Sequence, residues 1–169
     1  MFARNCLVLL ISLFLGACAA YSGSGLKPGE ARVEDVIRVM GEPAMRWQDP
    51  GGAVQLAYPR GPAGVHTYMV HLAPDGRLER IENVMDMQAF AQVRKDMTRD
   101  QVLRTLGPPV PAWTDYFKAR DELAWEWRWC NEVGAASRFN VLFDATAGTV
   151  RSTQSRMEIC GKGYCTCGR

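Results

Sequence analysis

The sequence predicts an α+β fold made of two tandem repeats, each with one or two short helices packed on a three-stranded antiparallel sheet. Three features favour this fold: an internal repeat, an apolar helical stripe opening each copy, and alternating apolar residues after it. Hydrophobic residues make up 47% of the 169 residues and charged residues 22%, as in ordinary globular proteins. The formal net charge is only +2, which argues against a nucleic-acid-binding protein.

The chain begins with the features of a secretory signal. Arg4 is the only charged residue before Lys27, and an apolar run covers residues 6–15. That run is too short for a membrane span, which needs about 20 residues, and has the length of a signal-peptide core. We therefore expect residues 1–17 to be a signal peptide.

A lipobox follows the apolar run. Leu15-Gly16-Ala17-Cys18 resembles the bacterial motif whose cysteine becomes the acylated first residue of the mature protein. Acyl chains on Cys18 would anchor the protein firmly, since each buried methylene contributes roughly 0.8 kcal/mol. Ala19 at the next position, where Asp usually implies inner-membrane retention, indicates sorting to the outer membrane. Residues 18–28, rich in Gly and Ser, are expected to form a lipidated tether on the periplasmic side.

Two segments separated by 66 residues are alike. Residues 36–49 and 102–115 are identical at six of fourteen positions, where ordinary composition would give about one match. The shared residues are Val36/Val102, Arg38/Arg104, Gly41/Gly107, Pro43/Pro109, Trp47/Trp113 and Asp49/Asp115. This similarity predicts two copies of one unit, repeat 1 over residues 29–86 and repeat 2 over residues 87–157.

Each copy should open with a helix that ends at a glycine. Apolar residues recur at helical spacing before Gly41 and before Gly107, and prolines follow both glycines. Thr98 and Gln101 form a predicted capping box. An earlier stripe, Phe90, Val93 and Met97, predicts an additional helix in repeat 2 alone.

Three strands are expected after each helix, because apolar residues then alternate with polar ones. The positions that define them are Val54, Leu56 and Tyr58, then Tyr68, Val70 and Leu72, then Leu78 and Ile81 in repeat 1, and Leu123, Trp125, Trp127 and Trp129, then Phe139, Val141 and Phe143, then Val150 to Ser155 in repeat 2.

The motifs together resemble the BamE-like (SmpA/OmlA) lipoprotein family. The resemblance rests on the lipobox, on the segment Met97-Thr98-Arg99-Asp100-Gln101-Val102, on the helix stop Leu106-Gly107-Pro108-Pro109 and on the aromatic strand over residues 125–129. It covers residues 29–157, as two copies. The family usually has Gly where this chain has Asp96, and repeat 1 has Gly29-Glu30-Ala31-Arg32 in place of the family's Gly-Met-Thr.

The resemblance implies a non-enzymatic accessory lipoprotein at the periplasmic face of the outer membrane. BamE itself is a subunit of the β-barrel assembly machinery, so the expected partners are envelope proteins of that kind. Tandem copies of this unit also resemble the β-lactamase inhibitor proteins, which grip an enzyme with a concave sheet surface. The alternative function is therefore a tethered inhibitor or sensor of a periplasmic enzyme. Only Cys18, as the lipidation site, is carried over from the family.

Four cysteines remain when Cys18 is set aside, an even number in an oxidising compartment. The first and third strands of a meander run parallel, so the end of the third strand should lie near Cys130. This topology predicts a Cys130–Cys160 disulfide, with Cys130–Cys165 as second choice. We expect residues 158–169 to form a Cys-rich tail. A thiol-active or metal-binding role for Cys165 and Cys167 is a third functional alternative, although their spacing differs from Cys-x-x-Cys.

Few residues could support catalysis. The two histidines of the chain, His66 and His71, are five positions apart and point to opposite faces of a strand. No enzyme activity, metal or cofactor is expected. Among aromatic residues, Trp125, Trp127 and Trp129 are expected in the core, with an exposed binding patch as the alternative. Trp47 and Trp113, in the loops after the helices, are the candidate partner-binding residues.

Overall fold

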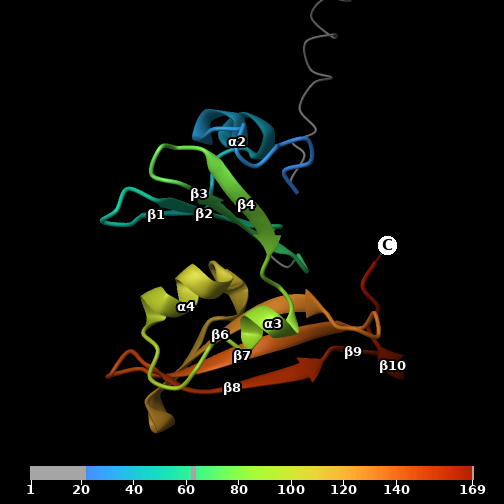
Figure 1. Ribbon diagram of the computed structural model, residues 1–169. Coiled ribbons are helices and arrows are strands. Elements are labelled where there is room, and N and C mark those ends of the chain that lie inside the picture. Colours follow the sequence, from blue (N-terminus) through green and yellow to red (C-terminus); the bar gives the residue numbers. More distant parts are fainter. Residues whose placement is uncertain (1–21, 62–63, 169) are drawn as a thin grey trace, which may run out of the picture.

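The computed structural model describes residues 22–61 and 64–168. The α+β prediction is confirmed: in these described ranges, two four-stranded antiparallel sheets and three α-helices form alternating layers (Figure 1). Helix α2 (Val33–Met40) covers one face of the first sheet, and helices α3 (Met87–Phe90) and α4 (Arg99–Leu106) lie between the two sheets. Among the described residues no helix is long and apolar enough to span a membrane.

Both sheets have their strands in sequence order. The first sheet consists of β1 (Met45–Gln48), β2 (Val54–Pro59), β3 (Thr67–Leu72) and β4 (Leu78–Asn83), and the second of β5 (Asp115–Phe117), β6 (Glu122–Cys130), β7 (Ala136–Asp144) and β8 (Val150–Met157). We call α2 with the first sheet the first unit, and α3, α4 and the second sheet the second unit. Two short 3-10 helices flank β5, at Pro111–Trp113 and Lys118–Arg120.

The prediction of three strands per sheet was wrong, because β1 and β5 add a fourth strand at one edge of each sheet. Both added strands are short, and β5 is exposed along its whole length. An edge strand of three or four residues buries too little surface to impose a clear alternation of apolar and polar residues. The other strands of the two four-stranded sheets lie where the alternation predicted them.

Helices α2 and α4 have the same length and end in the same way. The predicted capping box of α4 is present: the Thr98 amide donates to Gln101 Oε1 at 2.7 Å, and the Gln101 amide donates to Thr98 Oγ1 at 3.3 Å. The helices end at Gly41 (φ 83°, ψ −168°) and Gly107 (φ 73°, ψ −173°). That backbone region is essentially restricted to glycine.

An aromatic side chain of the second strand of each sheet, β2 or β6, forms a hydrogen bond with one of these glycines. In the first unit the Tyr58 hydroxyl donates to the Gly41 carbonyl at 3.2 Å, and in the second the Trp127 indole N–H donates to the Gly107 carbonyl at 3.2 Å. Burial and the nearby Glu42 carboxylate raise the pKa of Tyr58 to about 12, so this hydroxyl keeps its proton at neutral pH. Each helix end is thus fixed to the middle of its sheet.

Two apolar cores separate the layers. The smaller joins α2 to the first sheet through Val36, Met40, Leu56, Tyr58, Val70, Leu72 and Leu78. The larger combines residues of both units: Ala57, Met69, Val84, Met85, Ala89, Phe90, Val93, Val102, Leu106, Trp127, Trp129, Phe139, Val141, Phe143 and Val150. The predicted core position of the tryptophan row is confirmed: Trp127 and Trp129 are 2% and 4% exposed, and Trp125 packs against the same core.

The C-terminal tail corrects the predicted disulfide. Cys130 pairs with Cys167 and Cys160 pairs with Cys165, so neither Cys130–Cys160 nor Cys130–Cys165 forms. The reason is a hairpin of β9 (Ile159–Cys160) and β10 (Gly163–Tyr164) that reverses the chain after β8. The returning segment pairs with the start of β7, where the Ala136 amide donates to the Cys165 carbonyl at 2.7 Å, and this brings Cys167 beside Cys130.

We predict that alanine at the two helix-ending glycines has unequal effects. Both substitutions force a side chain into the glycine-only backbone region, which costs about 1–3 kcal/mol. A Cβ on Gly107 would also lie 2.8 Å from Thr67 Cγ2 in the first unit, whereas a Cβ on Gly41 meets no atom within 4 Å. Urea unfolding should show Gly107→Ala to be more destabilising than the matched Gly41→Ala by at least about 1 kcal/mol. Equal losses would contradict the close approach of the two units at Gly107.

Candidate functional site

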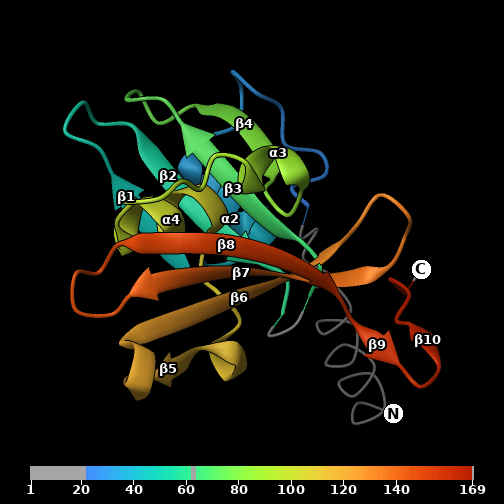
Figure 2. The ribbon, with the colours of Figure 1, turned by 90° about the horizontal axis from the view of Figure 1, so that it is seen from below.

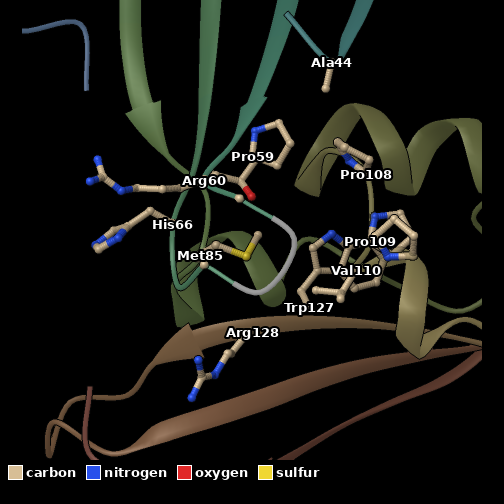
Figure 3. Close-up of a pocket in the computed structure, with 14 residues that line it drawn as sticks. Ala44, Pro59, Arg60, His66, Met85, Pro108, Pro109, Val110, Trp127 and Arg128 are labelled. Atoms are coloured by element: carbon tan, nitrogen blue, oxygen red, sulfur yellow. The ribbon is translucent and has the colours of Figure 1, made fainter. Parts of the chain in front are cut away.

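A pocket of about 360 Å³ opens between the two units, at the end of the β2–β3 hairpin (Figure 3). Its walls come from the start of β1, from the hairpin, from the loop after α4 and from β6. The lining residues are Ala44, Pro59, Arg60, Gly61, Gly64, His66, Thr67, Met85, Pro108, Pro109, Val110, Pro111, Trp127 and Arg128. Its volume lies within the range of small-molecule sites.

Most of the wall is apolar and held in place by hydrogen bonds of the backbone. Gly107 ends α4, and the prolines directly after it cannot continue the helix. The Val110 amide donates to the Glu126 carbonyl at 2.9 Å, which fixes this loop against β6. The Trp127 ring lies below the loop, with its N–H already bonded to the Gly107 carbonyl. The apolar wall is therefore built before any ligand arrives.

Polar side chains gather on one side of the pocket. Figure 3 shows Arg60, His66 and Arg128 away from Pro108 and Pro109. The Arg60 amide donates to the His66 carbonyl at 2.9 Å and closes the hairpin, so the two side chains are neighbours. Burial, together with the charge of Arg60, lowers the pKa of His66, so that the imidazole is neutral at neutral pH. Arg128 donates to Glu158 Oε2 at 2.8 Å and 3.1 Å.

A second recess of about 380 Å³ adjoins this polar side. It shares Arg60, Gly64, His66 and Arg128 with the pocket, and its remaining lining residues are Val65, Tyr68 and Gly168. The His66 ring stacks on Tyr68 with 6.0 Å between ring centroids. Among the described residues, those that line the two recesses include Arg60 and Arg128 and no Asp or Glu.

The outer face of the second sheet is a different kind of surface. No helix or strand in the described part of the chain covers it (Figure 2). Glu158 receives hydrogen bonds from Arg128 and from Arg138 (3.0 Å), and Arg138 also pairs with Glu126 at 3.2 Å. The Arg138 guanidinium lies 3.8 Å from the centroid of the Trp113 ring. Charged groups on this face are thus mostly paired with one another.

The two candidate tryptophans have different surroundings. Trp47, on β1, is half-buried between the units, and its indole N–H donates to Asp100 Oδ1 of α4 at 3.1 Å. Trp113 is half-buried on the outer face of the second sheet, beneath Arg138. The structure does not bring them together.

The other predicted residues lie elsewhere. Cys18 is outside the described residues. Cys130 and Cys160 hold the tail through two disulfides and are not among the residues that line the pocket. His71 lies on β3 and pairs with Glu82 at 2.8 Å. Burial, followed by the charge of Arg80, lowers the pKa of His71. In the described ranges, no three His, Cys, Asp or Glu side chains are grouped to hold a metal ion.

Sequence reasoning did not foresee the pocket. One signal in the sequence is the proline-rich segment 108–111, but prolines directly after a helix are equally typical of a helix stop. Comparison with known proteins gives no further guidance, because no family model, no curated protein and no solved structure matches the chain.

We predict that Glu158 stabilises the fold only while it is ionised. Burial opposes its ionisation, but the hydrogen bonds from Arg128 and Arg138 outweigh burial and hold the pKa of Glu158 below its usual 4.5. Glu158→Gln should therefore lower the free energy of unfolding at pH 7 by about 1–2 kcal/mol, because it removes the negative charge that accepts hydrogen bonds from Arg128 and Arg138.

A pH series of urea unfolding checks this prediction. Because the folded-state pKa is depressed, the contribution of the carboxylate is complete well above pH 4.5 and is lost as the pH falls below that value. The gap between wild type and Glu158→Gln should close in acid, while the exposed control Glu132→Gln should stay close to wild type throughout. A gap that stays constant down to pH 3 would refute the prediction.

Proposed function

We propose that this protein is a lipoprotein of the outer membrane, anchored through acylated Cys18 and exposed to the periplasm. In this proposal it serves as a non-enzymatic binding module in outer-membrane protein assembly or envelope maintenance. The pocket between the units is the observation that carries the binding role. The described residues that line it offer arginine and apolar side chains and no carboxylate base. Such a lining favours recognition over catalysis.

We further propose that the two units descend from one BamE-like module. Several features support common descent beyond the repeated sequence motif. Each unit has an eight-residue helix, a glycine at its end and four strands in the same order. In each unit the first residue of the last strand is also hydrogen-bonded to the segment just before the helix. The Leu78 amide donates to the Ala31 carbonyl, and the Val150 amide donates to the Met97 carbonyl. Ala31 and Met97 are separated by the same 66 residues as the sequence repeat.

The alternative function is that of a tethered inhibitor or sensor that binds a periplasmic enzyme through its sheet. The outer face of the second sheet favours this alternative, because it is uncovered by the described elements and carries Trp113 beside charged groups (Figure 2). Aromatic and arginine side chains dominate the binding energy of many protein interfaces.

The proposed membrane anchor is tested in cells. Wild-type protein should incorporate radiolabelled palmitate and co-fractionate with the outer membrane, while Cys18→Ala should lose both properties. The expected control is Cys6→Ala, which alters a cysteine of the apolar run and should keep both. Labelling that survives in Cys18→Ala would contradict the proposed anchor.

Crosslinking from the two surfaces separates the two functions. A photo-crosslinking amino acid at Val110 in the pocket should capture envelope-assembly proteins if the first proposal holds. The same probe at Trp113 should capture a soluble periplasmic hydrolase if the alternative holds. Capture of neither class from membranes would contradict both functions.

A further inference from the structure

We propose that the free edge of β8 binds an extended segment of a partner polypeptide, which adds to the four-stranded second sheet as a further strand. The backbone N–H and C=O groups of Thr153, Ser155 and Met157 are the hydrogen-bonding groups of this site. The inference rests on the proposed function only in taking the protein as a binding module. It adds a second binding surface and the kind of partner that this surface fits.

The backbone of β8 has unused hydrogen-bonding groups along the border of the second sheet (Figure 2). After a register shift near its start, the strand lies in regular antiparallel register with β7. The Glu158 amide, directly after the strand, donates to the Ala136 carbonyl of β7 at 2.8 Å. Because residues that face the neighbouring strand alternate with residues that face away, the N–H and C=O groups of Thr153, Ser155 and Met157 point out of the sheet. In the described part of the chain no backbone hydrogen bond from another segment reaches these three residues.

The same edge already pairs with a short segment of the chain itself. The Asp96 amide donates to the Val150 carbonyl and the Val150 amide donates to the Met97 carbonyl, both at 2.9 Å. The pairing covers only the start of β8, because the segment then runs toward Thr149 and away from the rest of the strand. Residues 151–157 are all exposed. The edge can therefore accept an added strand, and most of its length is open.

The other edges of the two four-stranded sheets are protected against strand addition, and this one is not. β1 and β5 are only four and three residues long. β4 carries Glu79, Arg80 and Glu82, and charged side chains discourage pairing at an edge. β8 has eight residues, no proline and an uncharged stretch from Ser152 to Ser155. A long, uncharged and exposed edge is the place where peptide segments add to a sheet.

The size and the side chains of the edge favour a peptide segment over a second copy of this chain. Pairing of β8 with its counterpart in another copy would engage the exposed residues 151–157 on each side, whereas stable interfaces use about 20–30 residues a side. An added peptide strand gains its affinity from main-chain hydrogen bonds and needs no such area. The side chains beside it are the hydroxyl and amide groups of residues 152–155, which pair favourably with threonine across strands. The expected partner is therefore a polar, threonine-rich segment in extended conformation.

Fluorescence anisotropy of a labelled peptide tests the proposal on the full chain carrying Cys18→Ser, which has no acylated cysteine. The probe is a blocked peptide as long as β8, with alternating threonine and valine and with a glutamate added at each end for solubility. A second peptide is N-methylated at two adjacent central residues, which removes a donor from each of its edges. It should bind at least about tenfold more weakly, because it loses a hydrogen bond to β8 and its methyl group prevents close approach.

A matched pair of variants locates the binding at β8. Thr153→Pro and Thr153→Ala both remove the threonine side chain, but only proline removes the N–H that faces the added strand. Thr153→Pro should weaken binding of the unmodified peptide at least about fivefold, while Thr153→Ala should stay within about twofold of the unsubstituted residue. This N–H does not bond to β7, so circular dichroism should show both variants folded. If Thr153→Pro is not folded, Ser155→Pro and the N-methylated peptide decide the matter.

The proposal is overturned if the unmodified peptide does not bind, if the N-methylated peptide binds equally well, or if Thr153→Pro binds like Thr153→Ala. It is also overturned if sedimentation shows a dimer that Thr153→Pro dissociates, because a second copy then occupies the edge. In each case crosslinking from Val110 to envelope proteins would still support the proposed binding function. Loss of that crosslinking with retained peptide binding would instead contradict the assembly role and leave the β8 site intact.

Discussion

The burial of α4 between two sheets is the constraint on which the rest of the structure depends. One side of the helix contributes Val102 and Leu106, both fully buried, to the core that contains Trp127. Its other side contacts the first unit, where Arg104 donates to Asp49 Oδ1 at 2.8 Å and the Trp47 indole bonds to Asp100. A helix with partners on two sides joins the units into one folded body, since neither sheet could separate without exposing apolar surface.

This arrangement explains the different faces of the two sheets. In the first sheet Leu56, Ala57 and Tyr58 are consecutive and all buried, because α2 covers one face and the second unit covers the other. In the second sheet the described elements cover only the inner face, and the outer face carries paired arginines and glutamates. The pocket lies between the two units because the β2–β3 hairpin of the first and the loop after α4 of the second border a space that neither unit fills alone.

Local signals predicted most secondary structure but little of the assembly. The glycine-terminated helices and the central strands follow from residue spacing and backbone preference, which act over a few residues. The edge strands β1 and β5 were missed because strands so short carry almost no pattern. The disulfide pairing was missed because a hairpin of residues 159–164 redirects the tail, and no periodicity marks where a chain reverses.

The pocket depends on contacts between residues far apart in the chain, so residue spacing could not locate it. Arg60 and Pro108, for example, are brought to one cavity only by the stacking of the units. One available signal was the run Leu56-Ala57-Tyr58, which breaks the alternation of a half-exposed strand and indicates a sheet covered on both faces. Trp47 and Trp113 occupy equivalent positions of the sequence repeat but have different structural surroundings. The connection from the helix to the first strand is longer in the second unit, so Trp47 lies on β1 whereas Trp113 precedes β5.

Native-state hydrogen exchange in a Leu106→Ala variant tests the role of α4 most directly. Leu106 is fully buried in the core shared by both units, and its truncation should cost about 2–5 kcal/mol. If α4 unites the two sheets, the most protected amides of β3 and of β7 should lose the same opening free energy. Loss of protection in β7 with unchanged protection in β3 would show that the sheets unfold independently and would contradict this account.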